Sequence, residues 1–232
     1  MKAFLLAAGL GTRLRPITNE IPKCLVPING KPLLEWWIKL FEKHDIKKVL
    51  INLHYLAEQV EEFINNYDTD IEFELFFEEQ LLGSAGTIKA NKSFIGNEER
   101  FLIAYADNLT NFNITNFVNF HDSHTLPFSI SLFRTDTPNM KGIVELDDEN
   151  TVISFEEKPD KPKSNLANAG IYIAEPEIVK LIDKEKSDIG YDLLPKLIGM
   201  MKGYIDDYYL LDIGTHQHLE QANREWRKLN EL

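Results

Sequence analysis

The stretch that decides the fold is Met1–Pro32, MKAFLLAAGLGTRLRPITNEIPKCLVPINGKP. A short apolar run near its start predicts a buried parallel strand, which ends abruptly at Gly9 and Gly11 before any helical pattern begins. Glycines there let the backbone take positive φ and bring several N–H groups close to one ligand, which suits polyphosphate oxygens. Arg13 and Lys23 add fixed positive charge. We therefore expect a strand that feeds an anion-binding loop.

This loop matches neither common nucleotide fingerprint. It lacks the Gly-Lys-Ser/Thr of a P-loop, and Thr12, Arg13 and Leu14 stand where a dinucleotide fold has its third glycine. The glycines alone also fit a tight turn with a surface arginine. The order of Arg13, the Pro22-Lys23 pair and Gly30-Lys31-Pro32 favours a nucleotide site over that turn.

Composition limits the partners of the chain. Its 232 residues are 44% hydrophobic, enough to bury the core of one α/β domain, and its net charge is -12. Such a charge repels nucleic acid and anionic membranes, so a polyanionic substrate needs local basic groups or a divalent metal. One cysteine excludes an internal disulfide, and we see neither a signal-peptide pattern nor a membrane-length apolar run. We expect a cytoplasmic protein.

Strand and helix patterns alternate after the loop. Helical spacing predicts helices, and apolar runs predict strands, in the order helix 33–41, strand 48–53, helix 56–64, strand 71–77, helix 84–92, strand 101–105, helix 112–121 and strand 128–133. This order predicts a parallel sheet with helices on both faces. Further along we expect a hairpin over 143–155, a strand at 168–173, short strands within 204–211 and a closing helix.

Two segments at strand ends carry candidate site residues. Residues 79–86 form a glycine-rich turn that opens a helix, where free N–H groups and small side chains accommodate a flat base. Asp107 lies just past the strand at 101–105, at the edge where such sheets bind ligands, and its oxygens suit Mg²⁺ held together with phosphates. In isolation Asp107 fits a turn or helix cap equally well.

With these motifs in place, the sequence resembles the sugar-1-phosphate nucleotidyltransferases, also called nucleotide-sugar pyrophosphorylases. Their opening pattern is close to LAAGxGTRLxPxTxxxPKxLxPxxxKP, and their later elements ExxLGxAG, FxEKP, NAGxY and DIGT match residues 79–86, 155–159, 168–172 and 212–215. The pattern is most similar to that of mannose-1-phosphate guanylyltransferase-like members. Cys24, Ala106 and Leu210 depart from the usual family residues.

The resemblance implies an α/β, Rossmann-like nucleotidyltransferase fold. Its central sheet would be mixed but mostly parallel, flanked by helices, with a small β-hairpin annex that binds the sugar. Residues 188–197 resemble a helix of the family and would have a structural role. Residues 1–232 would form one domain, in which about 1–135 bind the nucleotide and about 136–232 supply the sugar site and the closing helix.

The resemblance also assigns roles to matching residues. The nucleotide would contact Leu6, Ala8, Gly9, Gly11, Thr12, Arg13, Glu79, Gly83 and Ser84. Catalysis would depend on Arg13, Lys23 and Asp107, and Asp107 and Asp212 would hold Mg²⁺. The sugar phosphate would contact Gly142, Glu157, Lys158 and Asn168.

The reaction implied is NTP plus sugar 1-phosphate giving NDP-sugar plus pyrophosphate. The LGSAG turn favours GTP with a mannose-type or heptose-type phosphate. Uridylyl or thymidylyl transfer to a hexose 1-phosphate stays open, as does a cytidylyltransferase acting on an amino-alcohol phosphate. A noncatalytic nucleotide-sugar sensor is the more distant alternative. The expected partners are the two substrates, without nucleic acid or membrane, and a homo-oligomer is left open.

Overall fold

The computed structural model describes residues 1–230, and the side chains of residues 1–228. The chain forms two compact units that we describe separately. Unit 1 comprises Met1–Phe4, Leu82–Ala104 and Asn113–Asp207, and unit 2 comprises Leu5–Leu81, Tyr105–Phe112 and Tyr208–Leu232. The last two residues of the predicted single domain lie outside the described residues.

Unit 2 carries the N-terminal loop on a layered α/β frame. Its strands are the end of β1 (Lys2–Leu6), β2 (Pro27–Ile28), β3 (Lys31–Pro32), β4 (Lys48–Leu53), β5 (Glu72–Phe77), β7 (Asn108–Thr110) and β13 (Leu210–Asp212). Its α-helices are α1 (Leu33–Lys43), α2 (Ala57–Asn66) and α6 (His216–Asn230), and 3-10 turns cover Thr12–Leu14, Ile17–Asn19 and Lys23–Leu25. Strands β4 and β5 pair in parallel, as predicted from the β/α alternation.

Burial explains why α1 forms where the sequence predicts a helix. Leu33, Trp37, Ile38 and Phe41 recur at helical spacing and are all buried. Leu33 also belongs to an apolar cluster that joins the N-terminal loop to β7 and α6, with the members Leu14, Val26, Ile28, Leu109, Ile213, Ala222 and Trp226. The C-terminal helix therefore packs with the first third of the chain, inside unit 2.

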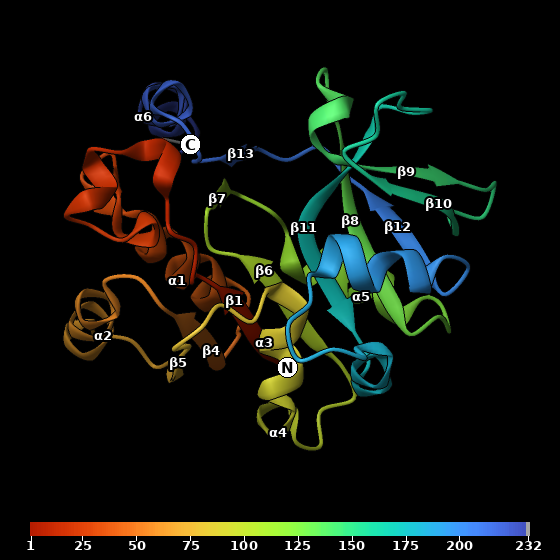
Figure 1. Ribbon diagram of the computed structural model, residues 1–232, viewed down its shortest axis with the longest axis horizontal. Helices are drawn as coiled ribbons and strands as arrows, with labels where there is room; N and C mark the ends of the chain where they lie inside the picture. Colours follow the sequence, from red (N-terminus) through yellow and green to blue (C-terminus); the bar gives the residue numbers. More distant parts are fainter. Residues whose placement is uncertain (231–232) are drawn as a thin grey trace. The chain divides into compact units, whose positions relative to one another are not determined.

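Unit 1 is built around the long strand β11 (Leu166–Ala174), which pairs antiparallel with three neighbours. These are β6 (Phe101–Tyr105), β8 (Phe128–Arg134) and β9 (Gly142–Leu146). Strand β10 (Val152–Glu157) pairs antiparallel with β9 as the predicted hairpin, and β12 (Met201–Ile205) pairs in parallel with β8. Figure 1 shows α5 (Ile114–Asp122), which packs on β8, β11 and β12.

The predicted class, an α/β fold with a mixed central sheet and flanking helices, is confirmed. Two helix predictions in unit 1 need correction. The helix expected at 84–92 is two helices, α3 (Ser84–Ala90) and α4 (Lys92–Ile95). The helix expected at 188–197 is a π turn at Ile189–Leu193 followed by a 3-10 turn at Leu194–Leu197. Pro195 explains the second difference, because it offers no N–H to a regular α-helix and clashes with the preceding turn.

The remaining turns of unit 1 are 3-10 segments at Pro138–Met140 and Pro176–Leu181. Within the described residues, no helix has the length and apolar character needed to cross a membrane.

Candidate active site

A cluster of opposite charges lies beside the N-terminal loop in unit 2. The Lys23 ammonium donates to Asp107 Oδ2 at 2.7 Å and to Asp212 Oδ1 at 3.1 Å. Arg13 Nη2 lies 3.7 Å from Asp212 Oδ2. The structure thus brings together four of the predicted site residues, two of them separated by more than a hundred positions in the chain.

Lys23 is the most enclosed member of this cluster. Its side chain is 9% exposed, whereas that of Arg13 is 64% exposed. Burial by itself lowers the pKa of Lys23, but the charges and hydrogen bonds of Asp107 and Asp212 outweigh burial and raise that pKa above its ordinary value. Lys23 is therefore a fixed cation at neutral pH, and Arg13 presents its guanidinium to solvent.

Strand pairing explains how the two aspartates meet. Asp107 directly precedes β7, and Asp212 ends β13. These strands pair antiparallel with Asp212 opposite Asn108, and the Ile213 N–H donates to the Asp107 carbonyl at 2.8 Å. A shift of one residue in this register would turn Asp212 to the other face of the ribbon.

The conformation of the glycine loop depends on Gly11 more than on Gly9. Gly11 has φ of 61°, and a Cβ there would lie 2.9 Å from Thr18 Cγ2 and 3.2 Å from Lys23 Cβ. Its carbonyl also accepts from the Thr18 hydroxyl at 2.7 Å, so Gly11 fixes the loop against the stem of Lys23. Gly9 does not have the expected positive φ and has open space around it. The loop leaves Gly9 and Thr12 exposed, whereas Leu6 and Ala8 are buried.

Another glycine makes room for the Arg13–Asp212 ion pair. A Cβ at Gly214 would lie 2.7 Å from Arg13 Nη2 and 3.0 Å from both carboxylate oxygens of Asp212. Gly214 follows Asp212 in the DIGT element. The residue type at this position therefore controls how closely Arg13 approaches the carboxylate.

Sequence reasoning missed two polar residues that support the loop. Asn52 accepts from the Ala7 N–H at 2.7 Å and donates to Glu78 Oε1 at 2.9 Å. Glu78 is 2% exposed, and its carbonyl accepts from His54 Nδ1 at 2.7 Å if that nitrogen carries the proton. Asn52 and Glu78 lie at the carboxyl ends of neighbouring parallel strands, and that position was the signal that could have identified them. Glu79, which the sequence favoured, is exposed.

Unit 1 holds the predicted sugar-phosphate residues, and two of them, Gly142 and Lys158, lie beside the Glu157 carboxyl group. A Cβ at Gly142 would lie 2.6 Å from Glu157 Oε2, and a Cβ at Gly190 would lie 2.9 Å from the same oxygen. Burial, assisted by the nearby charge of Asp188, raises the pKa of Glu157, against the opposing effect of Lys158. The two glycines thus let a largely enclosed carboxyl group lie close to the backbone at both positions.

Lys158 and Asn168 differ in how free they are to bind a ligand. Lys158 has φ of 50° and a side chain that is 56% exposed, and its ammonium lies 4.0 Å from Glu157 and 5.9 Å from the ring of Tyr191. Asn168 instead donates to the Tyr172 hydroxyl at 2.7 Å and accepts from the Gly170 N–H at 2.9 Å.

The turn at the start of α3 packs tightly against residues 187–189, where the π turn begins. Gly83 has φ of 76°, and any Cβ there would overlap the carbonyl of Ser187. The Ser84 hydroxyl donates to Asp188 Oδ2 at 2.8 Å and accepts from the Ile189 N–H at 2.8 Å. Gly83 is therefore required for packing, whatever ligand it contacts.

The two carboxylates of the Lys23 cluster are suitable ligands for a divalent metal ion. Among residues 1–228, no group of three or more His, Cys, Asp and Glu side chains forms a ready metal cluster. Asp107 and Asp212 nevertheless converge on one cation, the Lys23 ammonium. One or two carboxylates completed by substrate phosphates and water are the ligand set that Mg²⁺ prefers. The donor set fits such an ion.

Comparison with known proteins decides the family. A family model described as nucleotidyl transferase matches residues 2–228. The chain belongs to that family. The resemblance drawn from the glycine loop and the later motifs is thereby confirmed.

Two curated relatives are similar in sequence to most of this chain. UTP–glucose-1-phosphate uridylyltransferase of Synechocystis sp. is 33% identical over 97% of this chain and 63% of its own length. Mannose-1-phosphate guanylyltransferase catalytic subunit beta of Drosophila pseudoobscura pseudoobscura is 31% identical over 92% of this chain and 59% of its own. The chain thus spans about three fifths of the length of these curated relatives.

Among solved structures, HddC from Yersinia pseudotuberculosis is 26% identical with a TM-score of 0.83, covering 97% of this chain and 99% of that one. HddC has also been crystallised in complex with GMP-PN. A putative glucose-1-phosphate thymidylyltransferase from Bacillus anthracis has a TM-score of 0.86 at 24% identity, covering 97% of this chain and 94% of that one, which supports the fold alone.

Proposed function

We propose that this chain transfers a nucleotidyl group from a nucleoside triphosphate to a sugar 1-phosphate and releases pyrophosphate. The observation that carries the proposal is the Lys23 ammonium held between Asp107 and Asp212, beside the glycine loop and Arg13. A chain with a net charge of -12 gathers two cationic side chains at the glycine loop, to which the family resemblance assigns the nucleotide.

In this proposal the residues of unit 2 bind the triphosphate. Arg13 is exposed and has planar donors that suit phosphate oxygens, so it would grip the departing pyrophosphate. Lys23 would stabilise the charge that grows on the α-phosphate. The left-handed turn at Gly11 places the loop backbone against the stem of Lys23.

The residues of unit 1 bind the sugar phosphate. The Glu157 carboxyl group, which lies against the backbone at Gly142 and Gly190, would accept hydrogen bonds from sugar hydroxyls. Exposed Lys158 would orient the phosphate that acts as nucleophile. Asn168 Nδ2 donates one proton to the Tyr172 hydroxyl and would offer its second proton to the sugar.

The nucleotidyl transferase family generally uses a divalent metal, and we infer Mg²⁺ for this chain. Asp107 and Asp212 would hold the ion. When bound, it would supply charge neutralisation between two anionic substrates. Because the Lys23 ammonium contacts both carboxylates, the same aspartates that would bind the ion also position the lysine.

The reaction needs positioning and electrostatic stabilisation more than a protein nucleophile. An oxygen of the sugar phosphate forms a bond to the α-phosphorus, and the bond from that phosphorus to the β-bridging oxygen breaks. The electron pair leaves with pyrophosphate. No general base is required, because the sugar phosphate is already ionised at neutral pH.

For the nucleotide we propose GTP, with a mannose-type or heptose-type 1-phosphate. The LGSAG turn and the guanine nucleotide analogue bound to HddC support this choice. The uridylyltransferase among the relatives keeps UTP with glucose 1-phosphate as the second candidate.

Pyrophosphate release, measured across a grid of nucleoside triphosphates and sugar 1-phosphates with Mg²⁺, tests the proposal. We expect one nucleotide to be clearly preferred, and Asp107→Asn or Arg13→Ala to reduce turnover at least about a hundredfold. Arg15→Ala, a change at an exposed neighbouring arginine, is the matched control and should leave the rate unchanged. A silent grid would reject the enzyme and favour a noncatalytic nucleotide-sugar sensor.

A further inference from the structure

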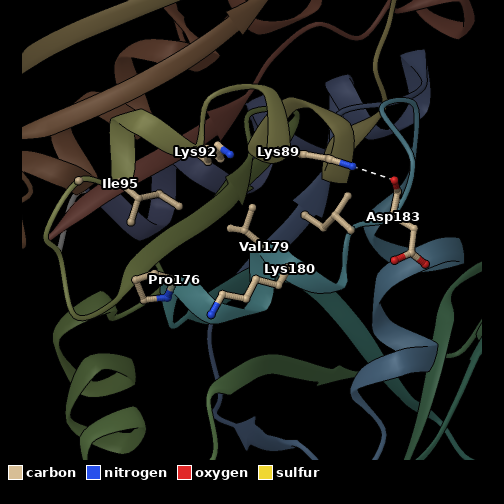
Figure 2. A pocket seen from close by; sticks show the side chains of 9 residues that line it. Lys89, Lys92, Ile95, Pro176, Val179, Lys180 and Asp183 are labelled. Carbon is tan, nitrogen blue, oxygen red and sulfur yellow. Dashed lines mark hydrogen bonds between the residues drawn. The ribbon is translucent and has the colours of Figure 1, made fainter.

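Unit 1 contains a second place suited to anions, a pocket none of whose lining residues is assigned to either substrate. A pocket of about 640 Å³ lies between the α3–α4 segment and the turn at Pro176–Leu181. Figure 2 shows Lys89 and Lys92 reaching over it from one wall and Lys180 from the other, with Val179 between them. Its volume is that of a typical small-molecule site.

The charge of this pocket opposes that of the whole chain. Three of its lining side chains are lysines, while the net charge of the protein is -12. The one acidic lining residue, Asp183, binds a lysine outside the lining, since Lys196 Nζ lies 2.6 Å from its Oδ2. Within the described side chains, neither Lys92 nor Lys180 forms an ion pair. The pocket therefore presents unneutralised positive charge.

One of the lysines is held in position before any ligand binds. Lys89 Nζ donates to the Asp183 carbonyl at 2.7 Å, a bond drawn in Figure 2. An ammonium has three protons, so two of those on Lys89 remain for an anion. The Asp183 segment is itself fixed, because the Ser187 carbonyl accepts the N–H groups of Ala85 and Gly86 at 3.0 Å each.

The floor of the pocket is apolar. Ile95 and Ile182 are 3% and 5% exposed, and Pro176 and Val179 complete the surface between the lysines. A bare inorganic ion would leave this floor uncovered. A ligand with both a phosphate and an apolar or aromatic part would satisfy the lysines and cover the floor.

We propose that this pocket is a second binding site, for a small organic phosphate whose anionic group contacts Lys89, Lys92 and Lys180 and whose apolar part lies on the Ile95–Val179 floor. The proposal does not depend on the chain being an enzyme. It requires only the charge and shape of unit 1.

Titration of the isotope-labelled full-length protein with phenyl phosphate, followed by amide chemical shifts, tests this proposal. We expect saturable shifts at residues 89–96 and 177–183. Lys92→Gln combined with Lys180→Gln should weaken that binding at least about tenfold, because two charge-assisted contacts are lost. Lys43→Gln combined with Lys47→Gln removes the same charge from the surface of unit 2 and should leave the affinity unchanged.

Three results would overturn the proposal. Shifts confined to residues 9–13 would mean that phosphate binds only at the N-terminal loop. Equal affinity of the wild-type protein and the Lys92/Lys180 double variant would remove these lysines from the site. Inorganic phosphate binding as tightly as phenyl phosphate would exclude a role for the apolar floor. Because the readout is local shift and not turnover, each result is independent of the fate of the proposed reaction.

Discussion

Replacing Lys23 by methionine tests the centre of the proposed active site most directly. Methionine keeps the length and the apolar stem of the side chain but removes the ammonium that contacts both Asp107 and Asp212. The two carboxylates would then lose the cation that both of them contact, although Arg13 Nη2 stays 3.7 Å from Asp212 Oδ2. Both stability and turnover should fall, for separate reasons.

The expected loss of stability follows from the geometry. The two carboxylate oxygens lie 2.7 and 3.1 Å from the same nitrogen. They are therefore at most about 6 Å apart, where two unit charges repel by about 3 kcal/mol at an effective dielectric constant of about 20. The Asp107 and Asp212 side chains are 40% and 25% exposed, so screening reduces the expected loss to about 1–2 kcal/mol. For a chain of this size, that corresponds to a Tm lower by about 3–6 °C.

Thermal unfolding with and without Mg²⁺, and pyrophosphate release, are the assays. Mg²⁺ should stabilise Lys23→Met more than the wild-type protein, because the bare carboxylates gain more from a cation, whereas turnover should stay at least about a hundredfold lower. Lys39→Met is the matched control, since Lys39 forms a surface ion pair with Glu35 at 3.3 Å and should change stability by less than about 1 kcal/mol. If Lys23→Met behaved like Lys39→Met in both assays, the proposed role of Lys23 would be wrong.

Three further predictions concern packing and titration. Gly83→Ala should lower the free energy of unfolding by about 2 kcal/mol more than Gly199→Ala, because both glycines have φ near 80° but only a Cβ at Gly83 meets the Ser187 carbonyl. Burial lowers the pKa of His121 from its ordinary value of about 6.5 to about 4. Between these two pH values the unfolded chain binds more protons than the native chain, so the free energy of unfolding should fall by up to about 3 kcal/mol as pH decreases through that window. Burial raises the pKa of the Cys24 thiol to about 12, so the native protein should react with thiol reagents only slowly, and the unfolded protein rapidly.

Each of these has a measurement that can contradict it. Denaturant unfolding should separate the two glycine variants, and equal losses would remove the steric explanation. The fall in Tm between pH 7 and pH 5 should be smaller in His121→Asn than in the wild-type protein, and an unchanged fall would assign that dependence to other groups. Immediate, complete labelling of native Cys24 by a thiol reagent would show that its burial is not maintained in solution.

Much of the fold could be predicted from local sequence. The strands at Lys48–Leu53 and Phe101–Tyr105 were predicted to the residue, because a short run rich in large apolar side chains is a local signal. The hairpin of β9 and β10 likewise followed from two alternating runs around a turn. The helix expected at 188–197 failed where Pro195 breaks the hydrogen-bond pattern, although that residue is visible in the sequence.

In the candidate site, too, some features could be predicted from the sequence and others could not. The sequence alone determined that a glycine loop with Arg13 and Lys23 follows the first strand, because spacing and residue type are local properties. The tertiary structure alone decided that the Lys23 ammonium contacts both Asp107 and Asp212.

It also decided that Gly11 and not Gly9 takes the left-handed conformation, and that Lys89, Lys92 and Lys180 share one pocket. Such contacts join positions far apart in the chain. They depend on the pairing register of short strands and on which surfaces are buried together, and no local pattern of residues encodes either.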